Sequence, residues 1–198
     1  MRTVEQTLRI GDCLDRRFAQ LRGEMATSKE RSLLELARLF EAERVPYALI
    51  GGVAVQIWSA EPRTTLDIDV AVVSYDDLPR AAMARAGFVL GRRFERPENW
   101  TGPDGAPVQF SDDPAFTEAV SRAKPYPVGG TALRVASVLD LVKAKLRAAR
   151  DPARRRSKRL MNLADASALA EQNPSVLDEV PPADRRFLGE GDPGVLPE

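Results

Sequence analysis

The chain has 198 residues and a mass of 21.8 kDa, and it contains no histidine and a single cysteine, Cys13. These counts exclude histidine-based nucleophilic catalysis, imidazole-ligated metals, an intramolecular disulfide and a thiolate metal cluster. The 29 basic and 29 acidic residues cancel, no apolar run is long enough to span a membrane, and residues 1–21 lack the apolar core of a signal peptide, so we expect a cytoplasmic protein without membrane partners.

The N-terminal region is expected to form two helices. The first should run from Val4 to Leu21, and Ser28 is a candidate N-cap for the second. In the second helix the apolar residues recur at helical spacing and form one face: Leu33, Leu36, Ala37 and Phe40. Pro46 ends this region.

Short strands and helices are expected to alternate next. Tyr47–Ile50 reads as a buried strand that stops at a tight turn, Gly51-Gly52, before a helix from Ala54 to Ser59. The clearest strand is 66–73, because its apolar residues alternate with the rest. The face that should be buried consists of Ile68, Val70 and Val72.

The middle of the chain should add a helix, a hairpin and a further helix. We expect helices at 77–86, closed by Gly87, and at 114–123, with strands at 88–90, 94–100 and 107–110. The turn-forming residues 101–105 predict a hairpin to which Trp100 and Val108 belong.

The C-terminal third is expected to be helical. After a short extended piece, 133–136, Ser137 should cap a helix to Arg150, and a second helix should span 154–171. The fold class predicted is therefore α/β (α+β), a short mixed sheet flanked by helices with a helical C-terminal part. The expected organisation is N-terminal helices (1–45), a core (46–136), the helical part (137–180) and a flexible, acidic, proline-rich tail (181–198).

Charge is unevenly distributed although it cancels overall. Residues 143–159 contain nine basic side chains and one acidic one, whereas 165–198 contain eight acids and two arginines. Such a basic segment is either a solvated helix face or a surface for phosphate-bearing ligands such as RNA. It contains no aromatic residue, so stacking on bases has no support there.

Two carboxylates carry the strongest chemical signal. Asp67 and Asp69 are two residues apart on a strand, so they should project from one face and repel unless a cation lies between them. Oxygen ligands suit Mg²⁺ or Mn²⁺. The strand–Gly51-Gly52–helix unit upstream offers backbone N–H groups that attract phosphate. Either motif alone occurs often by chance, but their order, each after an apolar strand, indicates phosphoryl or nucleotidyl transfer.

The segment YALIGGVAVQIWSAEPRTTLDIDVAVV resembles the nucleotidyltransferase fold shared with DNA polymerase β, in the version typical of AbiEii/AbiGii-type toxin nucleotidyltransferases. The residues that match the pattern are Gly51, Gly52, Arg63, Thr65, Asp67, Ile68 and Asp69. The resemblance implies that Asp67 and Asp69 bind the metal and that Gly51, Gly52, Arg63 and Thr65 lie at the nucleotide. Arg63 alone could equally well anchor the loop.

A second block, residues 136–169, is similar to the family's downstream Asp-Leu-x-x-x-Lys-Leu segment and following helix. By that match Lys145 reaches the nucleotide phosphates and Asp165 is the downstream carboxylate. Two positions depart from the pattern: Asn162 replaces an aspartate found in many relatives, and Gln109 stands where a third carboxylate is expected. Asp165 or the neighbouring pair Asp112 and Asp113 are the alternatives for that missing charge.

The leading hypothesis is Mg²⁺- or Mn²⁺-dependent transfer of a nucleoside monophosphate from an NTP to an acceptor, with RNA or tRNA favoured by the basic segment and a toxin-like role with an antitoxin partner implied by the resemblance. One alternative is a catalytically degenerate fold that acts as a binding or regulatory module, which Gln109 and Asn162 favour. Another is a small-molecule nucleotidyltransferase of the antibiotic-modifying kind.

Overall fold

The computed structural model describes residues 3–21, 29–59, 64–91 and 98–188. The chain divides into two compact units. The first consists of Met1–Ile57 and Pro62–Ala136, and the second of Trp58–Glu61 and Ser137–Glu198. No helix in the described ranges is long and apolar enough to cross a membrane.

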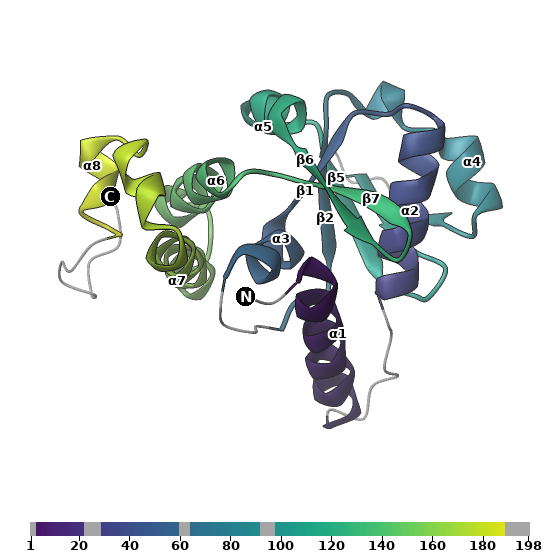
Figure 1. The fold of residues 1–198 in the computed structure, drawn as a ribbon, viewed down its shortest axis with the longest axis horizontal. Helices are drawn as coiled ribbons and strands as arrows, with labels where there is room; N and C mark the ends of the chain where they lie inside the picture. The colour runs from purple at the N-terminus through teal and green to yellow at the C-terminus, as the bar shows by residue number, and fades with distance from the viewer. Residues whose placement is uncertain (1–2, 22–28, 60–63, 92–97, 189–198) are drawn as a thin grey trace. The chain divides into compact units, whose positions relative to one another are not determined.

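The first unit is built on a mixed sheet with the strand order β3-β4-β5-β2-β1-β7-β6 (Figure 1). Its strands are β1 (Tyr47–Ile50), β2 (Ile68–Val72), β3 (Val89–Leu90), β4 (Glu98–Thr101), β5 (Pro107–Ser111), β6 (Lys124–Val128) and β7 (Thr131–Val135). At the centre, β2 runs antiparallel to β1 and parallel to β5, while β1 runs parallel to β7. The predicted mixed α/β class is confirmed.

The predicted strands lie where their apolar residues required them. All four residues of β1 are buried, and Ile68, Val70 and Val72 of β2 are at most 1% exposed. The hairpin predicted from the turn residues is formed by β4 and β5, and the structure sets its register, with Trp100 opposite Val108.

Strand β6 was missed by the sequence analysis. It contains Pro125 and Pro127, and proline cannot donate a ladder hydrogen bond, which argues against a central strand. The structure resolves the conflict by placing β6 at the edge of the sheet, where it pairs only with β7. An edge strand needs ladder bonds on one side only.

Helices of the first unit flank this sheet. They are α1 (Val4–Leu21), α2 (Glu30–Ala42), α3 (Gly51–Trp58), α4 (Arg80–Arg85) and α5 (Thr117–Arg122), with 3-10 turns η1 (Tyr75–Asp77) and η2 (Pro114–Phe116). The predicted apolar face of α2 is buried, and the ring of its Phe40 lies 5.3 Å from that of Tyr47 and 5.8 Å from that of Phe110. The proposed cap Ser28 lies outside the described residues, and Lys29, which precedes α2, makes no side-chain cap.

Several predicted boundaries were wrong. The strand expected over 66–73 spans only Ile68–Val72, and the helices expected over 114–123 and 154–171 begin at Thr117 and Arg156. The helix expected from Ala54 begins at Gly51, so the Gly-Gly pair forms its first turn instead of a separate turn before it. The helix expected over 77–86 is shorter, because Pro79 forces Leu78 into an extended conformation (ψ 123°) and α4 starts only after it.

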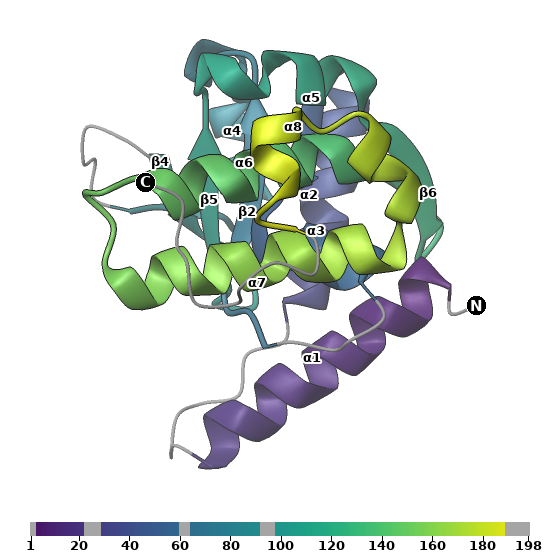
Figure 2. The same cartoon turned by 90° about the vertical axis from the view of Figure 1, so that its left-hand side faces the viewer.

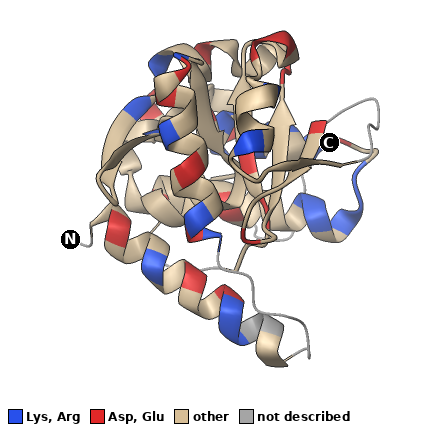
Figure 3. Cartoon of the chain, turned by 90° about the vertical axis from the view of Figure 1, so that its right-hand side faces the viewer, with Lys and Arg blue, Asp and Glu red and all other residues tan. Residues whose placement is uncertain are grey.

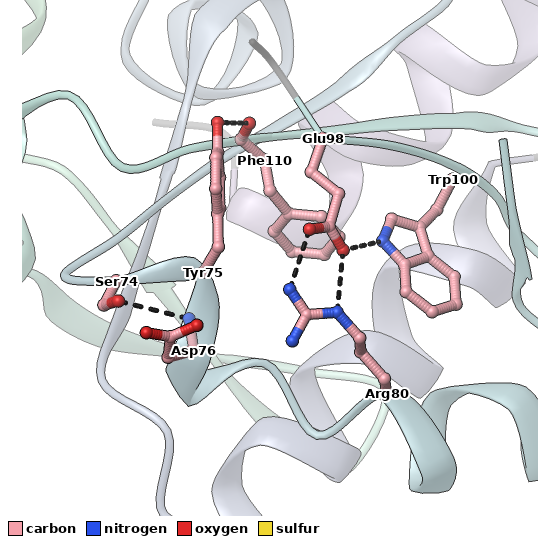
Figure 4. Close-up of polar contacts among 7 residues, drawn as sticks. All are labelled: Ser74, Tyr75, Asp76, Arg80, Glu98, Trp100 and Phe110. Atoms are coloured by element: carbon pink, nitrogen blue, oxygen red, sulfur yellow. Dashed lines mark hydrogen bonds and ion pairs between the residues drawn. The ribbon is translucent and has the colours of Figure 1, made fainter. Parts of the chain in front are cut away.

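A buried polar cluster attaches α4 to the sheet (Figure 4). The carboxylate of Glu98 accepts hydrogen bonds from Nη2 and Nε of Arg80, at 2.8 and 3.2 Å, and from the Trp100 indole at 2.9 Å. Glu98 and Trp100 share one face of β4 because they are two residues apart. Asn99 lies on the other face, opposite Gln109 of β5.

The second unit is helical. It contains α6 (Val138–Arg150), α7 (Arg156–Gln172), η3 (Pro174–Asp178) and α8 (Pro182–Arg185). The predicted cap of α6 is confirmed, because the Ser137 hydroxyl accepts a hydrogen bond from the Asp140 N–H. Helices α6 and α7 lie side by side, as Figure 2 shows, and bury Leu141, Leu146 and Leu169.

Candidate functional site

The acid pair lies at the start of the central strand β2. Asp67 directly precedes the strand and Asp69 is its second residue, and both side chains are half-buried. Ile68 between them is fully buried on the opposite face. The two carboxylates flank this buried side chain and lie on one side, as predicted, although Asp67 itself precedes the strand.

Asp69 packs directly over Gly51. A Cβ atom added to Gly51 would lie 1.9 Å from Oδ2 of Asp69, and Gly51 has a φ of +65°, a conformation that favours glycine. This close approach follows from the pairing of β1 with β2, in which Ile50 is opposite Asp69. The carboxylate consequently lies at the N-terminus of α3, where the helix dipole favours negative charge.

Thr65 occupies the corresponding place over Gly52. A Cβ atom on Gly52 would lie 2.3 Å from the Thr65 hydroxyl oxygen. The chain's own side chains thus require both glycines, since nothing larger fits beneath Asp69 and Thr65. This packing accounts for the Gly-Gly motif before any ligand is considered.

Gln109 of β5 is the third polar group on this face. It is in register with Asp69 in the parallel pair of β2 and β5, and its Nε2 donates a 3.2 Å hydrogen bond to Oδ2 of Asp67. Asp113, one of the acids considered as a substitute, instead caps η2 by accepting from the Ala115 N–H. An amide therefore stands beside the two carboxylates in the described structure.

The donor set fits a hard divalent ion. Two half-buried carboxylates share one face, and Mg²⁺ in proteins is commonly held by one or two carboxylates together with water and substrate phosphate oxygens. No group of three or more His, Cys, Asp or Glu side chains that could hold a metal is found among the described residues. The chain itself thus offers two charged oxygen ligands here, Asp67 and Asp69.

The second unit brings together the two downstream residues. Nζ of Lys145 on α6 lies 2.8 Å from Oδ2 of Asp165 on α7, and their side chains are 13% and 9% exposed. Asn162, one turn earlier on α7, donates through Nδ2 to the Lys158 carbonyl of its own helix. Lys145 and Asp165 therefore form an ion pair. That they act in one active site with Asp67 and Asp69 stays a prediction.

The other predicted site residues belong to the first unit. The first unit holds Gly51, Gly52, Thr65, Asp67 and Asp69 in mutual contact or adjacent positions, whereas Arg63 lies outside the described residues.

Sequence reasoning missed a buried ion pair that contacts the backbone of Thr65, formed by Asp15 of α1 and Lys29. No local pattern marks either residue, because both stand in ordinary charged stretches. Figure 3 shows how acidic and basic residues alternate along α1.

Comparison with known proteins supports the fold. No family model and no curated protein matches the chain. Among solved structures, an antigenic nucleotidyltransferase-like protein from Paracoccidioides brasiliensis matches with a TM-score of 0.50 and 15% identity, covering 84% of this chain and 95% of its own. The antibiotic-resistance factor ANT(2'')-Ia, solved in solution, matches with a TM-score of 0.51 and 15% identity, covering 76% and 90%. These likenesses show a nucleotidyltransferase fold, and the narrower AbiEii/AbiGii-type family is not confirmed.

Proposed function

We propose that this protein is a Mg²⁺- or Mn²⁺-dependent nucleotidyltransferase that moves a nucleoside monophosphate from an NTP to an RNA acceptor. An acceptor hydroxyl oxygen forms a bond to the α-phosphorus, the bond from that phosphorus to the diphosphate breaks, and the hydroxyl proton goes to solvent. The bound metal ion neutralises the triphosphate and the charge that develops on it.

The observation that carries the proposal is the placement of Asp69 over Gly51. Asp69 of the half-buried acid pair is pressed against the first turn of α3, where backbone N–H groups and the helix dipole favour phosphate oxygens as well as carboxylates. In the proposal Asp67 and Asp69 hold the metal, and Gly51, Gly52, Arg63 and Thr65 lie at the nucleotide.

The second unit supplies the other charges in this proposal. Lys145 binds the triphosphate or the leaving diphosphate, since an ammonium has three donors and the ion pair with Asp165 uses one of them. Asp165 orients the acceptor and completes the set of carboxylates in place of Gln109.

The test is transfer of label from each α-labelled NTP to total RNA. Asp67→Asn and Asp69→Asn should each lower the rate by about 10² to 10⁴, because each removes a charged metal ligand worth several kcal/mol in the transition state. Asp76→Asn is the matched control, since Asp76 is an exposed aspartate of the same unit in η1. Full activity of the Asp67→Asn protein would refute the assignment.

The RNA acceptor is supported by the basic segment of the second unit. Several of its side chains have partners within that unit: Arg150 pairs with Asp184, Arg154 pairs with Asp151, and Nε of Arg159 donates to the Ala149 carbonyl. The exposed basic residues that no such contact accounts for are Lys143, Arg155, Arg156 and Lys158. Their charges are available to phosphate groups of a nucleic acid.

Binding of RNA should therefore weaken steeply with salt. The triple variant Arg155→Gln/Arg156→Gln/Lys158→Gln should lower the slope of log K against log[salt] by about 2–3. The control changes three exposed arginines of the first unit, Arg31, Arg38 and Arg85, to glutamine and should leave the slope unchanged. A flat salt response of the unmodified protein would exclude an RNA acceptor bound through this segment.

A second candidate is a degenerate binding module, favoured by the hydrogen bond that Gln109 donates to Asp67. Calorimetry with Mg²⁺ and each NTP separates the two, because a module of this kind would bind no nucleotide. Gln109→Glu should raise Mn²⁺ affinity in the active enzyme, since a third carboxylate joins the site. Transfer to an antibiotic instead of RNA would favour the small-molecule alternative, and an antibiotic-resistance factor has a similar fold.

The toxin-like role and an antitoxin partner also belong to the proposal. Expression in a bacterial host should arrest growth, and Asp67→Asn should abolish the arrest. Normal growth of cells that contain active protein would refute the toxin-like role without affecting the proposed nucleotidyltransferase activity.

A further inference from the structure

A buried ion pair contacts the loop of residues 64–67, which precedes β2 in the first unit. Asp15 comes from α1 and Lys29 directly precedes α2, and their side chains are only 6% and 7% exposed. Burying two charges has a large desolvation cost, so such a pair is weak evidence for a purely stabilising role. The contacts of the pair indicate what else it does.

Both members bind the backbone of one residue, Thr65. Oδ1 of Asp15 accepts a 2.9 Å hydrogen bond from the Thr65 N–H, while the Lys29 ammonium donates to the Thr65 carbonyl and to the other oxygen of Asp15. The pair thus satisfies both the backbone N–H and the backbone carbonyl of one residue. Two segments from the N-terminal region are joined to one point of a loop that lies 36 residues beyond Lys29.

That loop has no regular structure of its own. Residues 64–67 belong to no helix or strand, so no ladder of backbone hydrogen bonds holds them. Thr65 lies two residues before Asp67, and its side chain presses on Gly52 at the start of α3. Whatever fixes the Thr65 backbone therefore fixes the point from which the Asp67 carboxylate projects.

We propose that Asp15 and Lys29 are positioning residues that hold the Thr65 backbone and thereby preorganise Asp67 for the metal. The inference rests on the proposed function, because Asp67 is taken as a metal ligand. Groups that orient metal ligands commonly change metal affinity by about 10- to 100-fold when they are removed.

The experiment replaces the pair by apolar residues of similar size, in the variant Asp15→Leu/Lys29→Met. Removing both charges together avoids leaving one buried and unpaired, so the fold should be retained. The matched control, Glu5→Leu/Arg9→Met, removes an exposed ion pair on the same helix, with side chains 43% and 67% exposed. Affinity for Mn²⁺ with a non-hydrolysable ATP analogue is measured by calorimetry, and exchange of the Thr65 amide hydrogen is measured in metal-free protein.

We expect the double variant to bind Mn²⁺ and the analogue at least 10-fold more weakly and to exchange the Thr65 amide at least 10-fold faster, with both values unchanged in the control. Asp15→Asn, which keeps the shape of the side chain, is the second variant if the apolar pair does not fold, and it should shift both values in the same direction. Unchanged Mn²⁺ affinity in a folded variant would overturn the inference. Absence of binding by the unmodified protein would instead overturn the proposed function, and the inference with it.

Discussion

Each unit contains a buried lysine–aspartate ion pair, and the two pairs differ in what surrounds the lysine. The ammonium of Lys29 donates to Asp15 and to the backbone carbonyl of Thr65, in the loop before β2. Lys145 joins two helices through Asp165, and no further hydrogen bond of its ammonium is found among the described residues. Two donors of the buried first lysine are used inside the protein, whereas the ion pair of the second lysine uses one donor and leaves two for a ligand.

The largest expected effect is the loss of the Lys29 charge. Lys29→Met leaves Asp15 buried without its cation, so the free energy of unfolding should fall by about 3–5 kcal/mol. Urea titration measures this loss, and the double variant Asp15→Leu/Lys29→Met should recover most of it. A loss below about 1 kcal/mol would contradict the cost expected for a buried Asp15 without its cation.

Next in size is the effect of filling the space under the acid pair. Gly51→Ala strains a positive φ and drives a Cβ into the Asp69 carboxylate, so it should destabilise the protein by about 2–4 kcal/mol and weaken Mn²⁺ binding. Gly130→Ala is the control, because its φ of +76° is similar and nothing lies within 4 Å of its added Cβ. The control should cost about 1–2 kcal/mol by unfolding and leave Mn²⁺ binding intact. Equal losses in both would show that only backbone strain matters.

Breaking the Lys145–Asp165 pair should cost less stability than breaking the first pair, but it should weaken nucleotide binding more. Lys145→Met removes one charged contact between α6 and α7, worth about 1.5–3 kcal/mol in the free energy of unfolding. Nucleotide affinity by calorimetry should fall at least 10-fold, about 1.4 kcal/mol. Lys143→Met, an exposed lysine on the same helix, should change neither quantity. Unchanged nucleotide affinity in Lys145→Met would make this pair structural like the first.

The smallest expected effect is a dependence on alkaline pH confined to the first unit, which contains Tyr47, Tyr75 and Tyr126. Burial raises the pKa of Tyr47 above its ordinary value of 10.0, against the opposing hydrogen bond from the Arg134 N–H. The folded state therefore keeps a proton that the unfolded state loses, so stability is complete below pH 10 and falls as pH rises through the raised pKa. Tyr47→Phe should flatten that fall, as measured by urea titration at pH 9–11. If stability falls equally steeply with pH in Tyr47→Phe, the loss of stability at alkaline pH does not come from Tyr47.

Local pattern was sufficient for much of the fold and of the acid pair. Alternation in β2 and helical spacing in α2 are short-range signals, and the structure buries those faces. The N-cap Ser137 was equally local. Strand β6 was missed because its prolines argue against a strand wherever edge placement is unknown, and placement depends on the whole sheet.

The sequence by itself determined that any chemistry must use carboxylates, Lys, Arg, Ser/Thr, Tyr or backbone groups, because no histidine is present and Cys13 is the single cysteine. It also predicted that Asp67 and Asp69 share one face at the central strand. Only the tertiary structure decided that Asp69 lies over Gly51, that Gln109 bonds to Asp67, and that Asp15 and Lys29 converge on Thr65. The physical reason is sequence separation. Periodicity reports which way a side chain faces along its own element, whereas contacts across 18 to 50 residues depend on how the elements pack.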